Sequence, residues 1–217
     1  MKRLLVVLAT VLIAMPAFSA VLVDWESGFT VGANGSINGS SADPGFDNPL
    51  VTLGVDITGD ANTLNLQVYS GEPGSPIPFG SNYLLVHTVG NNPGSPSVVT
   101  IDFQRRGSTW FAQGNSISID LWDTNTNPDP RITLVAYDDL GGVAETIGFS
   151  PLSGDSGTVT FTTPSLISRI EITDEGGDGY IADNLGFQLQ NTAVPEPSTV
   201  AMVGGGLLLA GLLRRRR

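Results

Sequence analysis

Cysteine is absent from the chain, and histidine occurs only once, as His87. Without a thiol the protein forms no disulfide, no zinc–thiolate site and no cysteine nucleophile. His87 lies in an apolar-rich run, and no G-x-S-x-G pattern accompanies it, so we interpret it as a strand residue with a local hydrogen bond. No P-loop or dinucleotide-binding glycine pattern stands between a strand and a helix. We therefore predict no catalytic residues and a protein that is not an enzyme.

Positive charge is nearly confined to the two ends of the chain. Between Ala20 and Ala193 four arginines stand against twenty acidic residues, which leaves a net charge of −16. Such a segment repels nucleic acid and anionic lipid head groups, so we expect no nucleic-acid partner. The acidic charge either attracts divalent cations or keeps the protein soluble.

The N-terminus has the pattern of a secretory signal peptide. A basic start precedes an apolar run at residues 4–14, and small residues stand at positions −3 and −1 of a cut after Ser19. The run is shorter than the ~20 residues that span a membrane. We predict that residues 1–19 form a signal helix that signal peptidase removes, with a cut after Ala20 as the alternative.

The C-terminus joins a proline-rich motif, a short apolar run and a basic end. The apolar run spans about 21 Å as a helix, which is less than a hydrocarbon core of ~30 Å. The terminal arginines do not cross the membrane and stay cytoplasmic. A short anchor behind an extended, accessible motif is typical of a processing signal, although an ordinary tail anchor is the alternative. The three parts are the motif Val194, Pro195, Glu196 and Pro197, the transmembrane helix Val200 to Leu213, and the stop Arg214, Arg215, Arg216 and Arg217.

This tail, residues 194–217, resembles the PEP-CTERM sorting signal of Gram-negative bacteria, with Pro195, Glu196 and Pro197 as its signature. The resemblance implies recognition by an exosortase, a membrane cysteine protease of bacteria that make extracellular polysaccharide. It also implies a transient anchor in the inner membrane, followed by a place at the cell surface or in the extracellular matrix.

Residues 20–193 contain no helical period, and short β-rich runs recur between Gly, Pro, Asn and Asp. We predict an all-β ectodomain, an antiparallel jelly-roll-like β-sandwich. Residues 27–49 and 71–78 are predicted to be long connections. The predicted strands are Val21–Glu26, Leu50–Ile57, Thr63–Tyr69, Tyr83–Val89, Ser97–Phe103, Ser116–Asp123, Ile132–Asp138, Ala144–Phe149, Thr158–Thr162, Ile167–Thr173 and Tyr180–Leu189.

The candidate metal site is acidic. The segment 174–184 alternates oxygen ligands with turn glycines, as Ca²⁺ prefers, but it does not fit an EF-hand loop. The opening segment 24–28 and the closing segment 180–187 together resemble jelly-roll carbohydrate-binding modules, in which an early Glu and a late Asp hold a structural calcium. On that resemblance Glu26 and Asp183 are the ligands. The alternative is an exposed acidic turn without metal.

Three tryptophans, Trp25, Trp110 and Trp122, are candidates for a sugar-stacking platform, because an aromatic face suits the apolar face of a pyranose. The alternative is that they fill the core of the sandwich. Trp110 is the preferred ligand platform, since it follows residues 105–107 in a predicted turn.

The preferred function is an exported, exosortase-sorted protein of the cell surface or extracellular matrix that binds exopolysaccharide without cleaving it. Two alternatives stay open. One is a secreted glycan hydrolase or lyase that uses a pair of its many carboxylates. The other is a purely structural surface protein.

Overall fold

The computed structural model describes residues 18–37, 42–71, 81–88, 96–103, 110–123, 132–150, 156–176 and 179–191. In eight strand residues of these ranges the backbone alone is described, and His87 and Trp110 are two of them. The predicted signal helix and the predicted membrane helix lie outside the described residues. Within the described part of the chain, no helix has the length and apolar character needed to cross a membrane.

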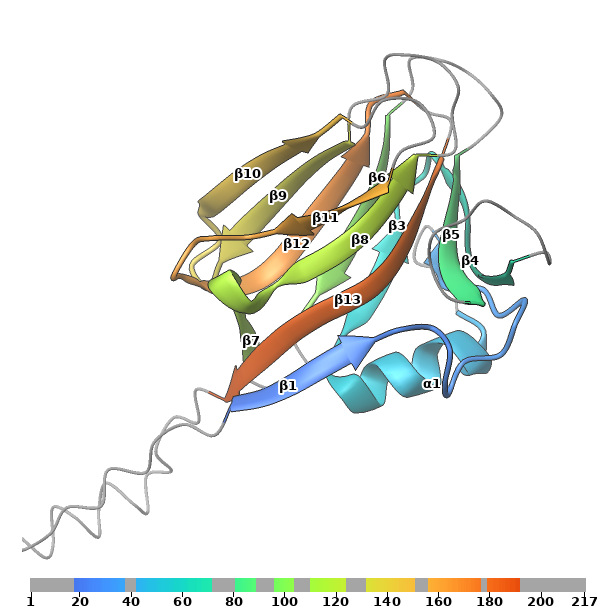
Figure 1. Ribbon diagram of the computed structural model, residues 1–217, viewed down its shortest axis with the longest axis horizontal. Helices are drawn as coiled ribbons and strands as arrows, with labels where there is room; N and C mark the ends of the chain where they lie inside the picture. The colour runs from blue at the N-terminus through green and yellow to red at the C-terminus, as the bar shows by residue number, and fades with distance from the viewer. Residues whose placement is uncertain are drawn as a thin grey trace, which may run out of the picture.

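The described residues form thirteen strands, one α-helix and one 3₁₀ turn (Figure 1). In chain order they are β1 Phe18–Val23, β2 Ser36–Ile37, α1 Pro44–Leu53, β3 Asp56–Gly59, β4 Thr63–Ser70, β5 Asn82–Thr88, β6 Ser97–Asp102, β7 Trp110–Gln113, η1 Gly114–Ser116, β8 Ser118–Asp123, β9 Ile132–Asp138, β10 Val143–Phe149, β11 Ser156–Thr160, β12 Leu166–Asp174 and β13 Tyr180–Asn191.

The strands make two layers. One layer runs β11-β8-β13-β5-β4, with β1 along the second half of β13, and the other runs β10-β9-β12-β6-β3-β2. β7 pairs with both β12 and β13 and joins the layers at one end. All pairings are antiparallel except that of β2 with β3. The chain changes layer at most of its connections after β5, as in a jelly roll, so the predicted antiparallel β-sandwich is confirmed (Figure 1).

The core lies between the layers and follows from the alternation of side chains along each strand. Along most of β9, β12 and β6 buried side chains alternate with half-buried ones, and the buried ones are apolar except for Ser97, Ser168 and Asp174. β13 supplies Leu185, Phe187 and Leu189 from the opposite layer, and the ring of Phe187 lies 5.1 Å from that of Phe103. Each such side chain contributes about 1.5–3 kcal/mol by leaving water.

Helix α1 corrects the prediction of a strand over Leu50–Ile57, because the first four of these residues are helical. Asp43 caps the helix, its Oδ1 accepting from the amide of Gly45 at 2.7 Å, and Gly54 ends it with φ 81°. Phe46 and Leu50, one turn apart, are both buried. In the sequence, Pro49 and the β-branched residues after it favour a strand over a helix. The helix forms because burial of its apolar stripe, Phe46 and Leu50, stabilises it.

Candidate functional site

The predicted sorting residues Val194 to Pro197 and the anchor and stop Val200 to Arg217 lie outside the described residues. The predicted signal-peptide cut falls inside β1, because this strand begins at Phe18 and pairs with β13 from that residue on. The boundaries of the three predicted segments therefore stay predictions.

Glu26, the first predicted metal ligand, is exposed in the turn that follows β1. Its Oε1 accepts a hydrogen bond from the amide of Asn82 at 2.9 Å, and the Asn82 side chain donates to the Trp25 carbonyl at 3.4 Å. These contacts fasten the turn to the beginning of β5. The carboxylate of Glu26 therefore has a structural role, which is to hold this turn against β5.

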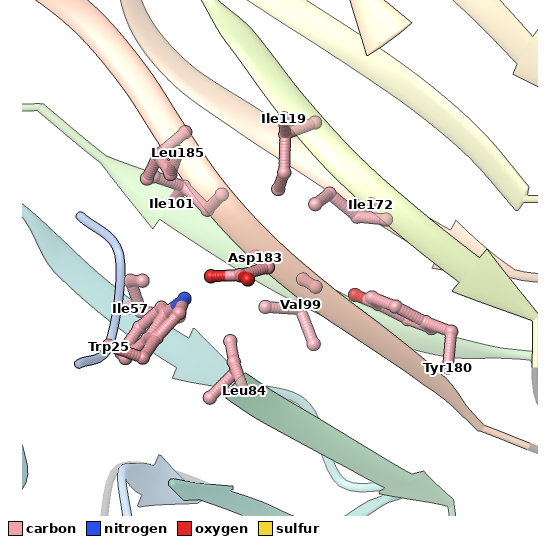
Figure 2. Close-up of a pocket in the computed structure, with 11 residues that line it drawn as sticks. Trp25, Ile57, Leu84, Val99, Ile101, Ile119, Ile172, Tyr180, Asp183 and Leu185 are labelled. Carbon is pink, nitrogen blue, oxygen red and sulfur yellow. The ribbon is translucent and has the colours of Figure 1, made fainter. Parts of the chain in front are cut away.

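Asp183, the second predicted ligand, is 2% exposed and points into a closed cavity of about 10 Å³ (Figure 2). Its Oδ1 accepts from the amide of Asn184 at 2.8 Å. The other walls of the cavity come from both layers and are mostly apolar. They are Trp25, Ile57, Leu84, Val99, Ile101, Ile119, Ile172, Tyr180, Ala182 and Leu185.

Among the described residues no group of three or more His, Cys, Asp or Glu side chains lies together to hold a metal ion. In the acidic turn, the carboxylate of Asp174 accepts from the amides of Gly176 at 3.0 Å and Gly179 at 2.9 Å. This carboxylate therefore holds its own turn. Calcium prefers six to eight oxygen ligands, and its binding by Glu26 and Asp183 stays a prediction.

Trp25 is a core residue. It is 1% exposed, its ring centroid lies 4.7 Å from that of Phe29 and 5.9 Å from that of Phe46, and its backbone has φ 57°. Its Nε1 faces the cavity of Asp183 (Figure 2). Neither this Nε1 nor the hydroxyl of Tyr180 has a hydrogen-bond partner among the described residues. Burial, followed by the charge of Asp174, raises the pKa of Tyr180 well above its ordinary value, so the phenol stays protonated.

Trp110, the predicted platform, is the first residue of β7, and the predicted turn at 105–107 lies outside the described residues. The backbone of β7 pairs with β12 and β13, two strands that lie far along the chain, and such pairing leaves no local signal. The Trp110 side chain lies outside the described residues, so its role as a platform stays a prediction. Trp122 is half-buried in β8.

A groove of about 470 Å³ opens between the end of β1 and helix α1. Its apolar wall includes Leu22, 58% exposed, and the half-buried ring of Phe29. Its polar wall is formed by short side chains that donate and accept hydrogen bonds. The lining residues are Leu22, Val23, Asp24, Ser27, Gly28, Phe29, Asn48, Pro49, Thr52 and Leu53.

The groove exists because the turn 24–29 and α1 rest on one aromatic cluster. The rings of Trp25, Phe29 and Phe46 contact one another, with Phe29 and Phe46 6.4 Å apart at their centroids. Trp25 and Phe46 are buried, whereas Phe29 also reaches the groove. A half-buried ring beside hydroxyl, amide and carboxylate groups suits a ligand that has an apolar face and a polar rim.

A second hollow of about 340 Å³ lies on the outer face of the other layer. Asp102, Arg169 and Tyr137 are cross-strand neighbours on β6, β12 and β9, so their side chains form one row. The turn from β9 to β10 makes its rim, with Leu140 90% exposed. The lining residues are Asp102, Tyr137, Asp139, Leu140, Gly141, Ser168 and Arg169.

Arg169 and Tyr137 in this hollow already have partners in the protein. The guanidinium of Arg169 lies 4.5 Å from the centroid of the Tyr137 ring, and its Nε lies 3.5 Å from Glu171 Oε1. The Tyr137 hydroxyl donates to Glu171 Oε2 at 2.7 Å, and this bond raises the pKa of Tyr137. Burial raises the pKa of Asp102; Arg169 acts to lower it and Asp56, its other cross-strand neighbour, adds to the increase.

Neither predicted metal ligand lines either hollow, although the groove includes residues of the opening segment 24–28 and of the predicted connection 27–49. The groove depends on α1, whose caps Asp43 and Gly54 were the available signal. The row of the second hollow depends on the register of four strands, for which the sequence carries no direct signal. Thr52 in the groove and Arg169 in the hollow were therefore missed, and Phe29 and Asn48 were included only as part of the connection 27–49.

No curated protein matches the chain. A solved mutant of a family 29 carbohydrate-binding module complexed with mannohexaose is 16% identical, with a TM-score of 0.41, over 79% of this chain and 92% of that one. The lectin-binding domain of lectinolysin complexed with Lewis b, also a mutant, is 16% identical with a TM-score of 0.31, over 50% of this chain and 72% of that one. A fucose-binding module of Streptococcus pneumoniae is 14% identical with a TM-score of 0.33, over 46% of this chain and 69% of that one. These TM-scores are low, and the fold described above rests on the pairing of this chain's own strands.

Residues 193–217 match the family described as the PEP-CTERM protein-sorting motif. The match begins one residue before the tail that resembled this signal in the sequence, so that resemblance is confirmed. The protein therefore ends in a PEP-CTERM sorting motif, which marks it for export and sorting to the cell surface.

Proposed function

We propose that this is a non-catalytic surface protein that binds a glycan in the groove between β1 and α1. The observation that carries the proposal is the composition of the groove. The ring of Phe29 and the side chain of Leu22 provide an apolar wall, and Ser27, Asn48 and Thr52 provide hydroxyl and amide groups beside it. A pyranose has the same two kinds of surface, an apolar face of C–H groups and a rim of hydroxyls.

The charge of the groove points to the class of glycan. Among the described residues that line it, Asp24 is the single ionisable side chain and none is basic. A uronic-acid polymer would bring carboxylates toward Asp24 and toward a chain whose segment 20–193 carries −16. The ligand that fits is a neutral exopolysaccharide, or one whose sugars carry free amino groups.

Affinity electrophoresis tests the proposal with the full-length protein in gels that contain the host's own exopolysaccharide. Phe29→Leu keeps an apolar side chain but removes the aromatic face, which contributes about 0.5–1.5 kcal/mol in such contacts. We expect roughly three- to tenfold weaker retardation from this change. Leu140→Ala, on the rim of the second hollow, is the matched control and leaves retardation unchanged. Equal retardation of the wild type and Phe29→Leu contradicts the groove as the binding site.

Trp110 is tested in the same gels. If its indole is a second stacking platform, Trp110→Ala weakens retardation while the melting temperature stays nearly constant. If the indole belongs to the core, the same change costs about 3–5 kcal/mol of stability.

We also propose the route by which the protein reaches the surface. Signal peptidase removes residues 1–19, the short apolar run holds the chain transiently in the inner membrane, and an exosortase cuts within 194–199. The support is the sorting motif at 193–217 and the brevity of the apolar run. The intact mass of the surface form tests the route, because a mass that still includes residues 200–217 contradicts it.

We propose separately that Glu26 and Asp183 bind a structural calcium ion. An ion bound only to the folded state adds about 2.7 kcal/mol at a hundredfold excess over its Kd. Calcium then raises the melting temperature relative to chelator, and Asp183→Ala abolishes the difference. Identical melts of the wild type in calcium and in chelator remove the site.

One observation favours a glycan hydrolase as the second candidate. Asp102 and Asp139 line the same hollow, and burial raises the pKa of Asp102, as for a general acid. Release of reducing sugar from the host's exopolysaccharide by the wild type, and its loss in Asp102→Asn, would establish this candidate in place of the binding protein.

A further inference from the structure

Three polar groups point into the closed cavity between the two layers. The turn after β1 supplies the indole of Trp25, and β13 supplies the hydroxyl of Tyr180 and the carboxylate of Asp183. Figure 2 shows these three groups turned toward the middle of the cavity. Each of the three residues is at most 2% exposed. Bulk solvent therefore does not reach them.

The two donors lack a hydrogen-bond partner in the part of the chain that the structure describes; they are Trp25 Nε1 and the Tyr180 hydroxyl. Burial raises the pKa of Tyr180, so its phenol keeps the proton that it donates. A buried donor without an acceptor costs the desolvation free energy of that group, and nearly all such groups in folded proteins bond to protein or to ordered water. The Asp183 carboxylate lies in the same cavity but bonds neither donor, so a further acceptor must lie between them.

The backbone beside the cavity has two unusual conformations. Trp25 has φ 57° and Asn184, which follows Asp183, has φ 48°, so both lie in the left-handed region. A bulky residue such as tryptophan is rare there and stays only where its surroundings fix it. The Trp25 ring contacts the rings of Phe29 and Phe46, while its Nε1 faces the cavity (Figure 2). The fold therefore holds Trp25 in a strained conformation with its polar atom turned inward.

The cavity has the size and the chemistry for one water molecule. Its volume of about 10 Å³ is near the lower limit of the roughly 10–15 Å³ that one water needs. A buried water typically makes about three hydrogen bonds. A water in this cavity can accept from Trp25 and Tyr180 and donate to Asp183, because an indole N–H only donates and a carboxylate oxygen accepts. A metal ion does not fit the same position, since Trp25 presents a hydrogen and no lone pair.

We propose that this cavity is a binding site for a single internal water molecule, which accepts hydrogen bonds from Trp25 Nε1 and the Tyr180 hydroxyl and donates one to the Asp183 carboxylate. This water fastens the turn 24–29, which forms part of the groove, to the middle of β13. Glu26 is exposed and does not line the cavity, so the calcium ion proposed above would lie at a different position. The water site does not depend on glycan binding.

NMR of the full-length protein in detergent micelles tests the site directly. The tryptophan indoles are isotope-labelled at nitrogen, and the signal of Trp25 is identified by its loss in Trp25→Phe. In the wild type the Nε1 proton of Trp25 should show a cross-peak to water with the sign of direct dipolar contact, which is opposite to that of chemical exchange in the rotating frame. The spectra are recorded with chelator, so that calcium does not contribute. Absence of this cross-peak overturns the site.

Tyr180→Phe controls for a false signal, because a buried hydroxyl that exchanges its proton with solvent can relay magnetisation to the indole. In this variant the water keeps two protein partners, which is within the usual range of two to four. The cross-peak of Trp25 should therefore persist. Its complete loss overturns the site, since the hydroxyl would then be the source of the signal.

A double-mutant cycle tests whether one water joins Tyr180 to Asp183. Free energies of unfolding in urea are measured with chelator for Tyr180→Phe, Asp183→Asn and the double variant. Because either change weakens the same water site, the loss in the double variant should be smaller than the sum of the two single losses. Tyr137→Phe, which removes a hydroxyl bonded to Glu171 in the other layer, is the matched control, and its loss should add to that of Asp183→Asn. Additive losses for Tyr180→Phe and Asp183→Asn overturn the three-partner site.

Discussion

The two hollows described above differ in the surroundings of their aromatic ring. In the groove between β1 and α1, hydroxyl, amide and carboxylate groups stand beside the exposed part of Phe29. In the hollow beside β9 and β12, Arg169 stacks on Tyr137 and both contact Glu171. The groove offers a ligand the exposed part of Phe29 beside its polar groups, of which Asp24 also accepts from the amide of Glu26 and Thr52 also donates to the carbonyl of Asn48. In the other hollow the Arg169 guanidinium already lies over the Tyr137 ring. The difference is the reason for placing glycan binding in the groove.

The largest expected difference between the two hollows concerns stability. Trp25→Ala removes the buried ring beneath the groove and should lower the free energy of unfolding by about 3–5 kcal/mol. Tyr137→Phe, in the other hollow, removes one half-buried hydroxyl and should cost about 1 kcal/mol or less. Urea denaturation of both variants measures the two values. If the two variants lost similar amounts of unfolding free energy, the view that an aromatic cluster organises the groove but not the second hollow would be contradicted.

A pH series sharpens the comparison through Asp102. Its pKa in the folded protein is raised above the ordinary value of 3.8, chiefly by burial. The folded state therefore binds this proton more tightly than the unfolded state, and stability falls as the pH rises from the ordinary pKa through the folded one. Asp102→Asn removes this loss of stability. The free energy of unfolding of the variant, relative to that of the wild type, should therefore increase across this pH range and stay constant above it. If the difference in unfolding free energy between the variant and the wild type did not change with pH, the raised pKa of Asp102 would be contradicted.

The smallest expected effect is on ligand charge. Asp24→Asn neutralises the one ionisable group among the described residues of the groove, and an exposed ion pair contributes about 0–1 kcal/mol. Binding to a polymer with free amino groups, such as chitosan, should weaken less than about tenfold, and binding to the neutral polymer dextran should not change. Alginate serves as the acidic probe. Stronger binding to alginate than to dextran by the wild type would contradict the predicted class of glycan.

The sequence predicted the sandwich because apolar and polar residues alternate along some of its strands. In residues 117–122 and 159–162 every second side chain is buried, as this alternation predicts. It did not predict α1, since Pro49 and the β-branched residues that follow favour a strand and only tertiary burial of Phe46 and Leu50 decides against it. It did not predict β7, whose partners are distant in sequence.

The candidate site was harder to predict than the fold for a related reason. Trp25 was singled out as a stacking candidate, and Glu26 and Asp183 as metal ligands. In the structure Trp25 and Asp183 face a closed cavity, and Glu26 accepts from the backbone amide of Asn82. The groove itself arises only when α1 packs beside β1. Its chemistry therefore belongs to the tertiary structure and not to a motif.

Hydrogen–deuterium exchange of the full-length protein, with and without the host's exopolysaccharide, tests the central claim most directly, because it reports on both hollows in one sample. Binding in the groove should slow exchange in residues 22–29 and 48–53 and leave the turn 138–142 unchanged. Protection confined to 138–142, with none in 22–29 or 48–53, would contradict it.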